Sequence, residues 1–387
     1  MMFFAEHSSN RVLVHVVGAL YTKLDSAEAL CNGTDPARLG NLRSFIGKMR
    51  RPNTPAIFLH VACIATLMVA PAVVTAQQET VLHSFAENDG VDGDEPVAGL
   101  VSDAAGKLYG TTAGGGVNTG CLQIGCGTVF ELSPTAGGGW TERILHNFSE
   151  DGIDGYFPSS SLVIDSAGNL YGTTNFGGAN YYGAVFELSP GTAGKWTEKI
   201  LYSFNNNGSD GYNPWSGVVI GTGGRLYGTT PYGGTHSAGT VFQLTPHVNG
   251  KWTEKILHSF GSGTDGTFPW GGVVVDKSGN LYGTGETGGS NTGCLGELGC
   301  GIVFELSNKN GQWSERVLHT FTNNGATGAF PFAGLTVSST GDLYGTTIGG
   351  GTFGMGTVFQ LSRNKSVWTE RVIQNFDGTT GAARMEA

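Results

Sequence analysis

Charge of either sign is scarce in this sequence, and so are the motifs of common catalytic sites. Only 13% of the 387 residues are charged, and the formal net charge is −10. An acidic chain repels phosphate backbones, so we do not expect nucleic acid as a partner. There is no Gly-x-Ser-x-Gly, His-Glu-x-x-His or P-loop motif, and no Gly-X-Y period of collagen. These absences give no reason to assign a catalytic residue or a cofactor.

A long apolar run occurs near the N-terminus, from Ala56 to Val74. It follows the basic stretch Met49-Arg50-Arg51 and ends in Val74-Thr75-Ala76, which is the layout of a secretory signal peptide. We therefore predict a signal peptide over 49–76, cleaved near Ala76, and an extracellular or cell-surface protein with no membrane span in its mature chain. An uncleaved membrane anchor is the alternative. We interpret residues 1–48 as a non-native N-terminal extension, because they precede the signal.

Glycine is abundant, with 65 residues, and much of it belongs to an internal repeat. The sequence Leu-Tyr-Gly-Thr occurs five times, at steps of 62, 56, 55 and 62 residues, starting at Leu108, Leu170, Leu226, Leu281 and Leu343. Each copy is followed by a Gly-rich stretch, a Val-Phe-Glu/Gln-Leu unit and a Trp-Thr/Ser-Glu unit. The segment 77–387 is thus predicted to be one repeat domain, with repeats at about 97–148, 159–204, 215–260, 270–321 and 332–376.

Each repeat contains four short runs rich in Val, Ile, Tyr, Phe and Thr. In the second repeat these are Ser161–Asp165, Leu170–Thr174, Ala184–Leu188 and Trp196–Phe204, bounded by turn residues. No window within the repeats shows a helical apolar period. The pattern predicts an all-β, propeller-like array of four-stranded antiparallel blades, in which neighbouring blades bury one another's faces. A β-solenoid is the alternative architecture.

The repeat count leaves the closure of such an array open. One extra copy of the fourth run, Thr80–Phe85, precedes the first full repeat, and Asp377–Gly381 resembles the start of another. Two interpretations follow: a ring of five blades with a spare edge strand, or a piece of a longer array.

Whole repeats resemble the GloVer (Gloeo/Verruco) tandem-repeat family of secreted bacterial proteins. The resemblance covers roughly residues 79–380 and is carried by Tyr-Gly-Thr-Thr, the following Gly-Gly, Gly-Thr-Val-Phe-Glu-Leu-Ser-Pro and Asp-Gly-x-x-Pro. It implies export and repetition. It implies no established activity and no catalytic residues.

Four of the six cysteines lie inside the repeats, as the pairs Cys121/Cys126 and Cys294/Cys300. Each pair falls in an insertion between the second and third runs of its repeat. In an oxidising compartment this spacing predicts two local disulfides. A zinc site made of four cysteines is the alternative, and the distance expected between the first and fourth repeats argues against it. We therefore expect no metal site.

Aromatic residues crowd around the Asp-Gly-x-x-Pro turns, which the predicted topology places on one face. Exposed rings beside polar groups are typical of sugar binding. The candidate ligand-binding residues are Tyr156, Phe157, Tyr212, Trp215, Phe268, Trp270, Phe330 and Phe332. Their recurrence at equivalent positions favours the alternative that they fill gaps between blades. Packing is also favoured for the histidines of the fourth run (His83, His146, His258 and His319), because Tyr202 and Gln374 replace them in other copies.

The sequence therefore favours an extracellular binding or surface-interaction module, with glycans or cell-envelope polymers as its ligands. We expect it to act as a monomer without a cofactor. Two alternatives remain open at this stage. One is a polysaccharide-active hydrolase or lyase, which would need acids or a His/Tyr base in the channel. The other is a structural spacer without a specific ligand.

Overall fold

A computed structural model describes residues 11–15, 79–85 and 91–379, except positions 119, 122, 123, 262, 263, 292, 295–297 and 366. The predicted signal peptide, 49–76, and most of the predicted extension, 1–48, lie outside the described residues. Among the residues that are described, no helix has the length and apolar character needed to cross a membrane.

Each repeat forms one four-stranded antiparallel sheet, and we number these sheets 1 to 5 along the chain. The first strands are β4 (Val101–Ser102), β10 (Val163–Ile164), β16 (Val219–Ile220), β22 (Val273–Val275) and β28 (Thr336–Val337). The second strands are β5 (Leu108–Thr112), β11 (Leu170–Thr174), β17 (Leu226–Thr230), β23 (Leu281–Gly285) and β29 (Leu343–Thr347). The third strands are β7 (Thr128–Pro134), β13 (Ala184–Pro190), β19 (Thr240–Pro246), β25 (Ile302–Lys309) and β31 (Thr357–Asn364). The fourth strands are β8 (Trp140–Asn147), β14 (Trp196–Ser203), β20 (Trp252–Ser259), β26 (Gln312–Thr320) and β32 (Val367–Asn375).

Shorter elements complete the fold. Two-residue strands pair the Asp-Gly turn with the Gly-rich stretch of the same repeat: β3 (Gly93–Asp94) with β6 (Gly114–Gly115), β9 (Gly155–Tyr156) with β12 (Phe176–Gly177), β15 (Gly211–Tyr212) with β18 (Tyr232–Gly233), β21 (Gly266–Thr267) with β24 (Thr287–Gly288), and β27 (Gly328–Ala329) with β30 (Gly349–Gly350). Single 3-10 turns, η1 (Thr192–Gly194) and η2 (Thr222–Gly224), join strands in sheets 2 and 3. Strands β1 (Arg11–His15) and β2 (Glu79–Ser84) form a separate two-stranded sheet.

The glycine of the Leu-Tyr-Gly-Thr motif has a packing role in the second strand. In β5, a Cβ atom on Gly110 would lie 2.6 Å from the Phe130 ring and 2.6 Å from Leu100, which is far closer than real contacts allow. Gly172, Gly228, Gly283 and Gly345 meet the equivalent phenylalanine in the same way. The missing side chain lets the phenylalanine ring of the third strand lie across the second strand, so the second strand can be buried on both faces.

The third and fourth strands share an irregularity at one equivalent position in every sheet. In sheet 1 the register shifts between Val129 and Phe130, so that Val129 pairs with His146 and Phe130 pairs with Ile144. One residue of β8, Leu145, is therefore extra, as in a β-bulge, which bends the strand and redirects the side chains that follow. The bulge thus lies directly before the recurring histidine of the fourth strand.

The hydrophobic cores lie between consecutive sheets. The cluster shared by sheets 1 and 2 joins Val129 and Phe148 of the first to Leu170 and Phe186 of the second. At each such junction two buried phenylalanines meet, with ring centroids 5.0–5.1 Å apart: Phe148 with Phe186, Phe204 with Phe242, Phe260 with Phe304, and Phe321 with Phe359. Phe85, which follows β2, meets Phe130 of sheet 1 in the same manner. Each sheet therefore depends on its neighbours for burial of its apolar side chains.

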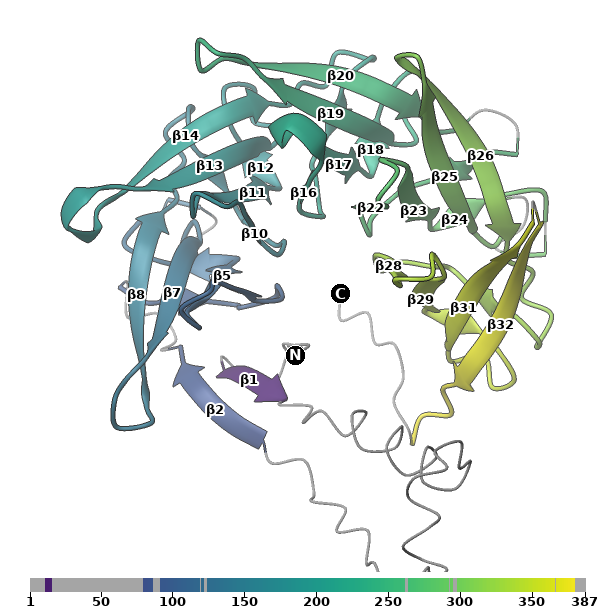
Figure 1. Cartoon of the computed structure of the whole chain (residues 1–387), viewed down its shortest axis with the longest axis horizontal. Helices are drawn as coiled ribbons and strands as arrows, with labels where there is room; N and C mark the ends of the chain where they lie inside the picture. The colour runs from purple at the N-terminus through teal and green to yellow at the C-terminus, as the bar shows by residue number, and fades with distance from the viewer. Residues whose placement is uncertain are drawn as a thin grey trace, which may run out of the picture. The chain divides into compact units, whose positions relative to one another are not determined.

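All five sheets belong to one compact unit of the chain. Figure 1 shows them in sequence order, with the first strands β10, β16, β22 and β28 facing a common centre and the fourth strands β8, β14, β20, β26 and β32 on the outside. The prediction of an all-β array with five four-stranded antiparallel sheets is confirmed. Its closure into a propeller remains a prediction.

Candidate functional site

The segments just before the five first strands line one shared cavity of about 510 Å³. Equivalent positions of all five repeats contribute to it: Val97–Gly99, Ser159–Val163, Trp215–Val219, Trp270–Val273 and Phe332–Gly334. A volume of this size is within the range of small-molecule sites, which is about 300–1,000 Å³. The lining segments lead into the first strands, and of these strands β10, β16, β22 and β28 face a common centre in Figure 1.

Threonines of the second strands hold these lining segments in place. The hydroxyl of Thr111 donates to the carbonyl of Ser160 in the next repeat at 3.1 Å, and that of Thr173 donates to the carbonyl of Ser216 at 2.9 Å. Thr284 makes the same bond to Ala333, whereas Thr229 donates to Pro269, directly before the lining segment of repeat 4. Because each bond joins one sheet to the lining of the next or to the residue before it, the cavity wall is fixed by the same motif that builds the sheets.

The lining is chemically uneven around the cavity. Repeats 3, 4 and 5 contribute Trp215, Trp270 and Phe332, whereas repeats 1 and 2 have Val97 and Ser159 at the equivalent position. The three rings form a continuous cluster. Trp215 meets Trp270 edge-on at 5.7 Å, and Trp270 stacks on Phe332 at 5.3 Å with 24° between the planes.

One tryptophan of this cluster is anchored, and the tryptophan next to it is exposed. The indole N–H of Trp270 donates to the Glu286 carboxylate at 2.8 Å, which fixes the orientation of the ring. Trp215 is 44% exposed. An anchored aromatic surface that reaches solvent is what a ligand with apolar faces needs.

The remaining candidate aromatics lie elsewhere. Tyr156 and Phe157 pack against the core between sheets 1 and 2, Tyr212 against that between sheets 2 and 3, and Phe330 against that between sheets 4 and 5. Phe268 meets Tyr232 edge-on at 6.0 Å. The structure therefore brings only three of the eight candidates, Trp215, Trp270 and Phe332, to the cavity.

A simple signal in the sequence separates the two groups, and sequence reasoning missed it. Each turn contains a proline, and the ring that follows the proline lines the cavity. The residue that precedes it has a positive φ, as Phe157, Phe268 and Phe330 do at 56°, 52° and 57°. The N–H of this residue donates to a carbonyl of the previous repeat, as Phe157 does to Cys126. Its carbonyl accepts an N–H of its own repeat, as Phe157 does from Asn175. Such a residue fixes the turn between sheets.

Both predicted disulfides are formed, between Cys121 and Cys126 and between Cys294 and Cys300. The first packs into the core between sheets 1 and 2 and the second into that between sheets 4 and 5. They close the insertions that lengthen the first and fourth repeats.

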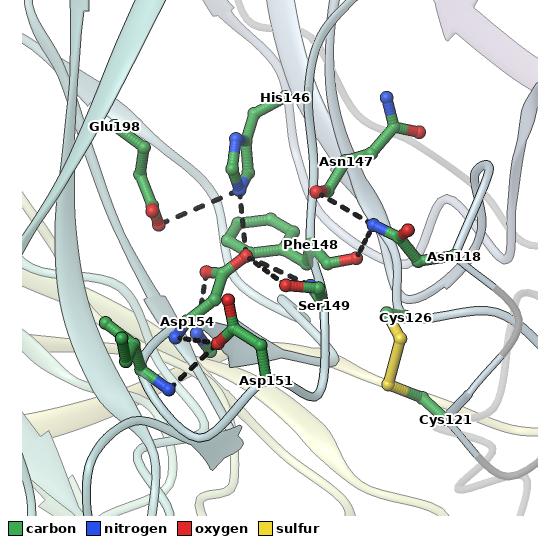
Figure 2. Close-up of polar contacts among 12 residues, drawn as sticks. Asn118, Cys121, Cys126, His146, Asn147, Phe148, Ser149, Asp151, Asp154 and Glu198 are labelled. Carbon is green, nitrogen blue, oxygen red and sulfur yellow. Dashed lines mark hydrogen bonds and ion pairs between the residues drawn. A yellow bond between two sulfur atoms is a disulfide. The ribbon is translucent and has the colours of Figure 1, made fainter.

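A second group of polar residues recurs at the outer part of the junctions between sheets. At the junction of sheets 1 and 2 it consists of His146 from β8, Asp154 from the turn before β9 and Glu198 from β14 (Figure 2). The Nε2 atom of His146 lies 3.2 Å from Asp154 Oδ2 and 3.8 Å from Glu198 Oε1. The imidazole also meets the Phe148 ring edge-on at 4.7 Å. The packing expected for this histidine is present, and it is combined with a polar contact that the sequence did not predict.

Burial raises the pKa of the glutamate at every junction. Desolvation, followed by the nearby carboxylate of Asp92 or Asp210, raises the pKa of Glu142 to about 7 and that of Glu254 to about 8. The pKa of Glu198 is raised by the same two effects, with Asp154 as the neighbour. Where Thr327 replaces the aspartate, desolvation lowers the pKa of His319 to about 4. Burial disfavours the charged form of each group, and for these three glutamates a neighbouring carboxylate adds to this effect.

The motifs of the five sheets match a family known from sequence. The model of the Gloeobacter/Verrucomicrobia repeat matches residues 72–206 and 192–387. The chain belongs to this family. Among curated proteins, none matches the chain.

Two solved structures are similar in outline. The endo-arabinase from Bacteroides thetaiotaomicron VPI-5482 aligns over 76% of this chain and 99% of its own, with 12% identity and a TM-score of 0.34. RS223-Beta-xylosidase aligns over 74% of this chain and 98% of its own, with 12% identity and a TM-score of 0.33. Similarity at this level carries no argument about what the present chain binds.

Proposed function

We propose that this Gloeobacter/Verrucomicrobia repeat protein is an exported binding module whose sheets form a propeller-like array and whose central cavity takes a neutral glycan. The observation that supports this most directly is the cluster of Trp215, Trp270 and Phe332 on one side of the cavity. Apolar faces of sugar rings stack on such aromatic rings, while neighbouring polar groups bond the hydroxyls.

The cavity lining also supplies suitable polar groups. Ser159 and Ser161 come from repeat 2, and Ser216 comes from repeat 3, next to Trp215. None of the described residues that line the cavity carries a charge, so a neutral saccharide fits it better than a uronic acid or a phosphate. Export to the cell surface, where such polymers occur, is the prediction made from residues 49–76.

A hydrolytic role has less support from this site. Glycoside hydrolysis commonly uses two carboxyl groups that flank the bond to be cleaved. The described lining residues include no Asp or Glu, and Glu286 is held by the Trp270 indole next to the cavity. Binding without cleavage is therefore the function that the geometry favours.

An array of neutral envelope polysaccharides and plant glycans, probed with the full chain, tests this proposal. We expect retention of at least one neutral polymer and a change in tryptophan fluorescence on binding. Trp270→Ala removes the ring that touches both of the others, and we expect affinity to fall by at least about tenfold, which corresponds to roughly 1.4 kcal/mol.

Phe353→Ala is the matched control, because Phe353 is a 59% exposed aromatic residue outside the cavity lining. It should bind as the unchanged protein does. Equal binding by Trp215→Ala, Trp270→Ala and the unchanged chain would refute the cavity as the site. Retention of no glycan at all would refute the proposed ligand class.

A further inference from the structure

At two junctions, one between sheets 1 and 2 and the other between β2 and sheet 1, three side chains that can ligate a metal ion lie close together. One comprises His146, Asp154 and Glu198, and the other His83, Asp92 and Glu142. In each, one ligand atom per residue lies within 4.8 Å of the other two. Within the part of the chain that the structure describes, no further group of three such residues meets this condition.

The glutamate of each group has an oxygen without a hydrogen-bond partner. Oε1 of Glu142 and Oε1 of Glu198 are buried and accept no hydrogen bond, and the same atom of Glu254, Glu315 and Glu370 is unpaired at the other three junctions. Buried polar atoms in native proteins are almost always paired, so an unpaired carboxylate oxygen calls for a specific explanation. The oxygen of Glu198 points toward His146 Nε2 at 3.8 Å, which is too long for a hydrogen bond (Figure 2). A cation would satisfy this oxygen where a histidine and an aspartate both lie beside it, so the complete donor set distinguishes these two junctions, and the unpaired oxygen alone does not.

The separations at the first group are close to those around a small cation. Ligands about 2.0–2.2 Å from a tetrahedral zinc ion lie about 3.3–3.6 Å from one another. The two measured separations, 3.2 Å to Asp154 and 3.8 Å to Glu198, lie on either side of this range. One imidazole nitrogen and two carboxylate oxygens form a donor set that zinc accepts, with water as the fourth ligand.

Neighbouring groups hold Asp154 in the orientation that a ligand requires. Its Oδ1 accepts the N–H of Gly155 at 2.7 Å, and its Oδ2 accepts the N–H of Ser149 at 3.0 Å (Figure 2). The equivalent Asp92 accepts the N–H of Gly93 at 2.8 Å. Bonds of this kind from outside the coordination sphere orient the ligands of protein metal sites.

The other three junctions serve as comparisons within the same chain. Tyr202 replaces the histidine between sheets 2 and 3, and Thr327 replaces the aspartate between sheets 4 and 5. Between sheets 3 and 4, His258 bonds Asp265 at 2.8 Å, but no described residue places a third ligand atom within 4.8 Å of both. Among the described residues, the complete set of donors is thus found only at the first two junctions.

We propose that His83–Asp92–Glu142 and His146–Asp154–Glu198 are two sites for a divalent metal ion such as zinc. Each site would link neighbouring elements at the outer part of a junction. The first would fasten β2 to sheet 1, because His83 lies in β2 and Glu142 in β8. The second would fasten sheet 1 to sheet 2. This assignment departs from the sequence analysis, which expected no metal.

Zinc binding by the full chain tests the proposal. After dialysis against micromolar zinc chloride, we expect retention of one ion per site, measured by mass spectrometry of the metal content. His83→Gln and His146→Gln should each lose one equivalent, and the double variant should lose both. The matched control is His258→Gln. His258 has the same aspartate bond and the same contact with a phenylalanine, at 4.6 Å, but lacks the third ligand.

Glu198→Gln provides a second variant that keeps the shape of the side chain and removes the carboxylate. It should lose the same equivalent of zinc as His146→Gln. When cobalt replaces zinc, this variant should also lack the visible absorption bands of the ion bound at that site. Zinc should also raise the melting temperature of the unchanged chain more than that of either variant. Equal metal content in His146→Gln, His258→Gln and the unchanged protein would overturn the proposal, as would the absence of retained zinc in the unchanged protein.

Discussion

The junction of sheets 1 and 2 and the junction of sheets 2 and 3 have the same apolar framework and different polar centres. The phenylalanine pairs Phe148–Phe186 and Phe204–Phe242 have identical centroid separations of 5.1 Å. Beside them lie His146 at the first junction and Tyr202 at the second.

The difference shows how far each part of a repeat can vary. The apolar contact is set by the spacing of the sheets, so it recurs unchanged. The polar position needs only a side chain that bonds the following aspartate, and histidine and tyrosine both do so. Only the histidine also adds a metal ligand. Variation at this position can therefore change chemistry without changing the fold.

The largest effect should come from the framework that the two junctions share. Phe148→Ala and Phe204→Ala each leave a cavity at a fully buried position. We expect each to lower the free energy of unfolding by about 3–5 kcal/mol, by the same amount within error. Guanidinium unfolding of the full chain measures this. A negligible cost at either position would show that the frameworks are not equivalent.

A smaller effect should come from the polar centre between sheets 2 and 3. The Tyr202 hydroxyl donates to Asp210 Oδ2 at 2.8 Å. Tyr202→Phe removes this donor from a buried carboxyl group, which should cost about 1–3 kcal/mol. Tyr181→Phe is the control, since Tyr181 is 56% exposed and should be neutral. Thermal unfolding of both variants compares them, and equal melting temperatures would contradict the importance of the bond.

The smallest effect should be a change in pH dependence at the same junction. The pKa of Glu254 is raised in the folded chain to about 8, by burial and then by Asp210, from an ordinary value of 4.5. The folded state therefore holds this proton more tightly than the unfolded state. Its contribution to stability falls as the pH rises from 4.5 to 8 and is constant outside that window.

Glu254→Gln removes this titration. We expect the variant to match the unchanged protein near pH 4 and to exceed it at pH 8 by on the order of 1 kcal/mol, after allowance for solvent screening. Melting temperatures between pH 4 and 9 measure the difference. The exposed Glu150→Gln change should leave the profile unaltered. Parallel profiles for Glu254→Gln and the unchanged chain would show that the glutamate is not buried as described.

Local patterns predicted the regular part of the fold well. The run Leu170–Thr174 was assigned as a strand with the bounds that β11 has, and the run Trp196–Phe204 contains β14. The two-residue pairs, such as β9 with β12, were not predicted. They are too short to carry a periodic pattern, and they form because the sheets bring the two loops together.

The candidate site was predicted less well, because its residues were grouped by type and proximity in sequence. Tyr212 and Trp215 are three residues apart in one turn, yet one packs into a core and the other lines the cavity. The histidines were treated as packing residues because Tyr202 interrupts their series. Their contacts with Asp154 and Glu198 join three segments of the chain, and no local window contains all three.

The sequence by itself determined the five-fold repetition, the four strands of each unit and the two disulfides, because each depends on residues close together in the chain. Only the tertiary structure decided which rings face the central cavity and which junctions gather a histidine, an aspartate and a glutamate. Those outcomes depend on how consecutive sheets pack, and the repeat places chemically different residues at equivalent points of that packing.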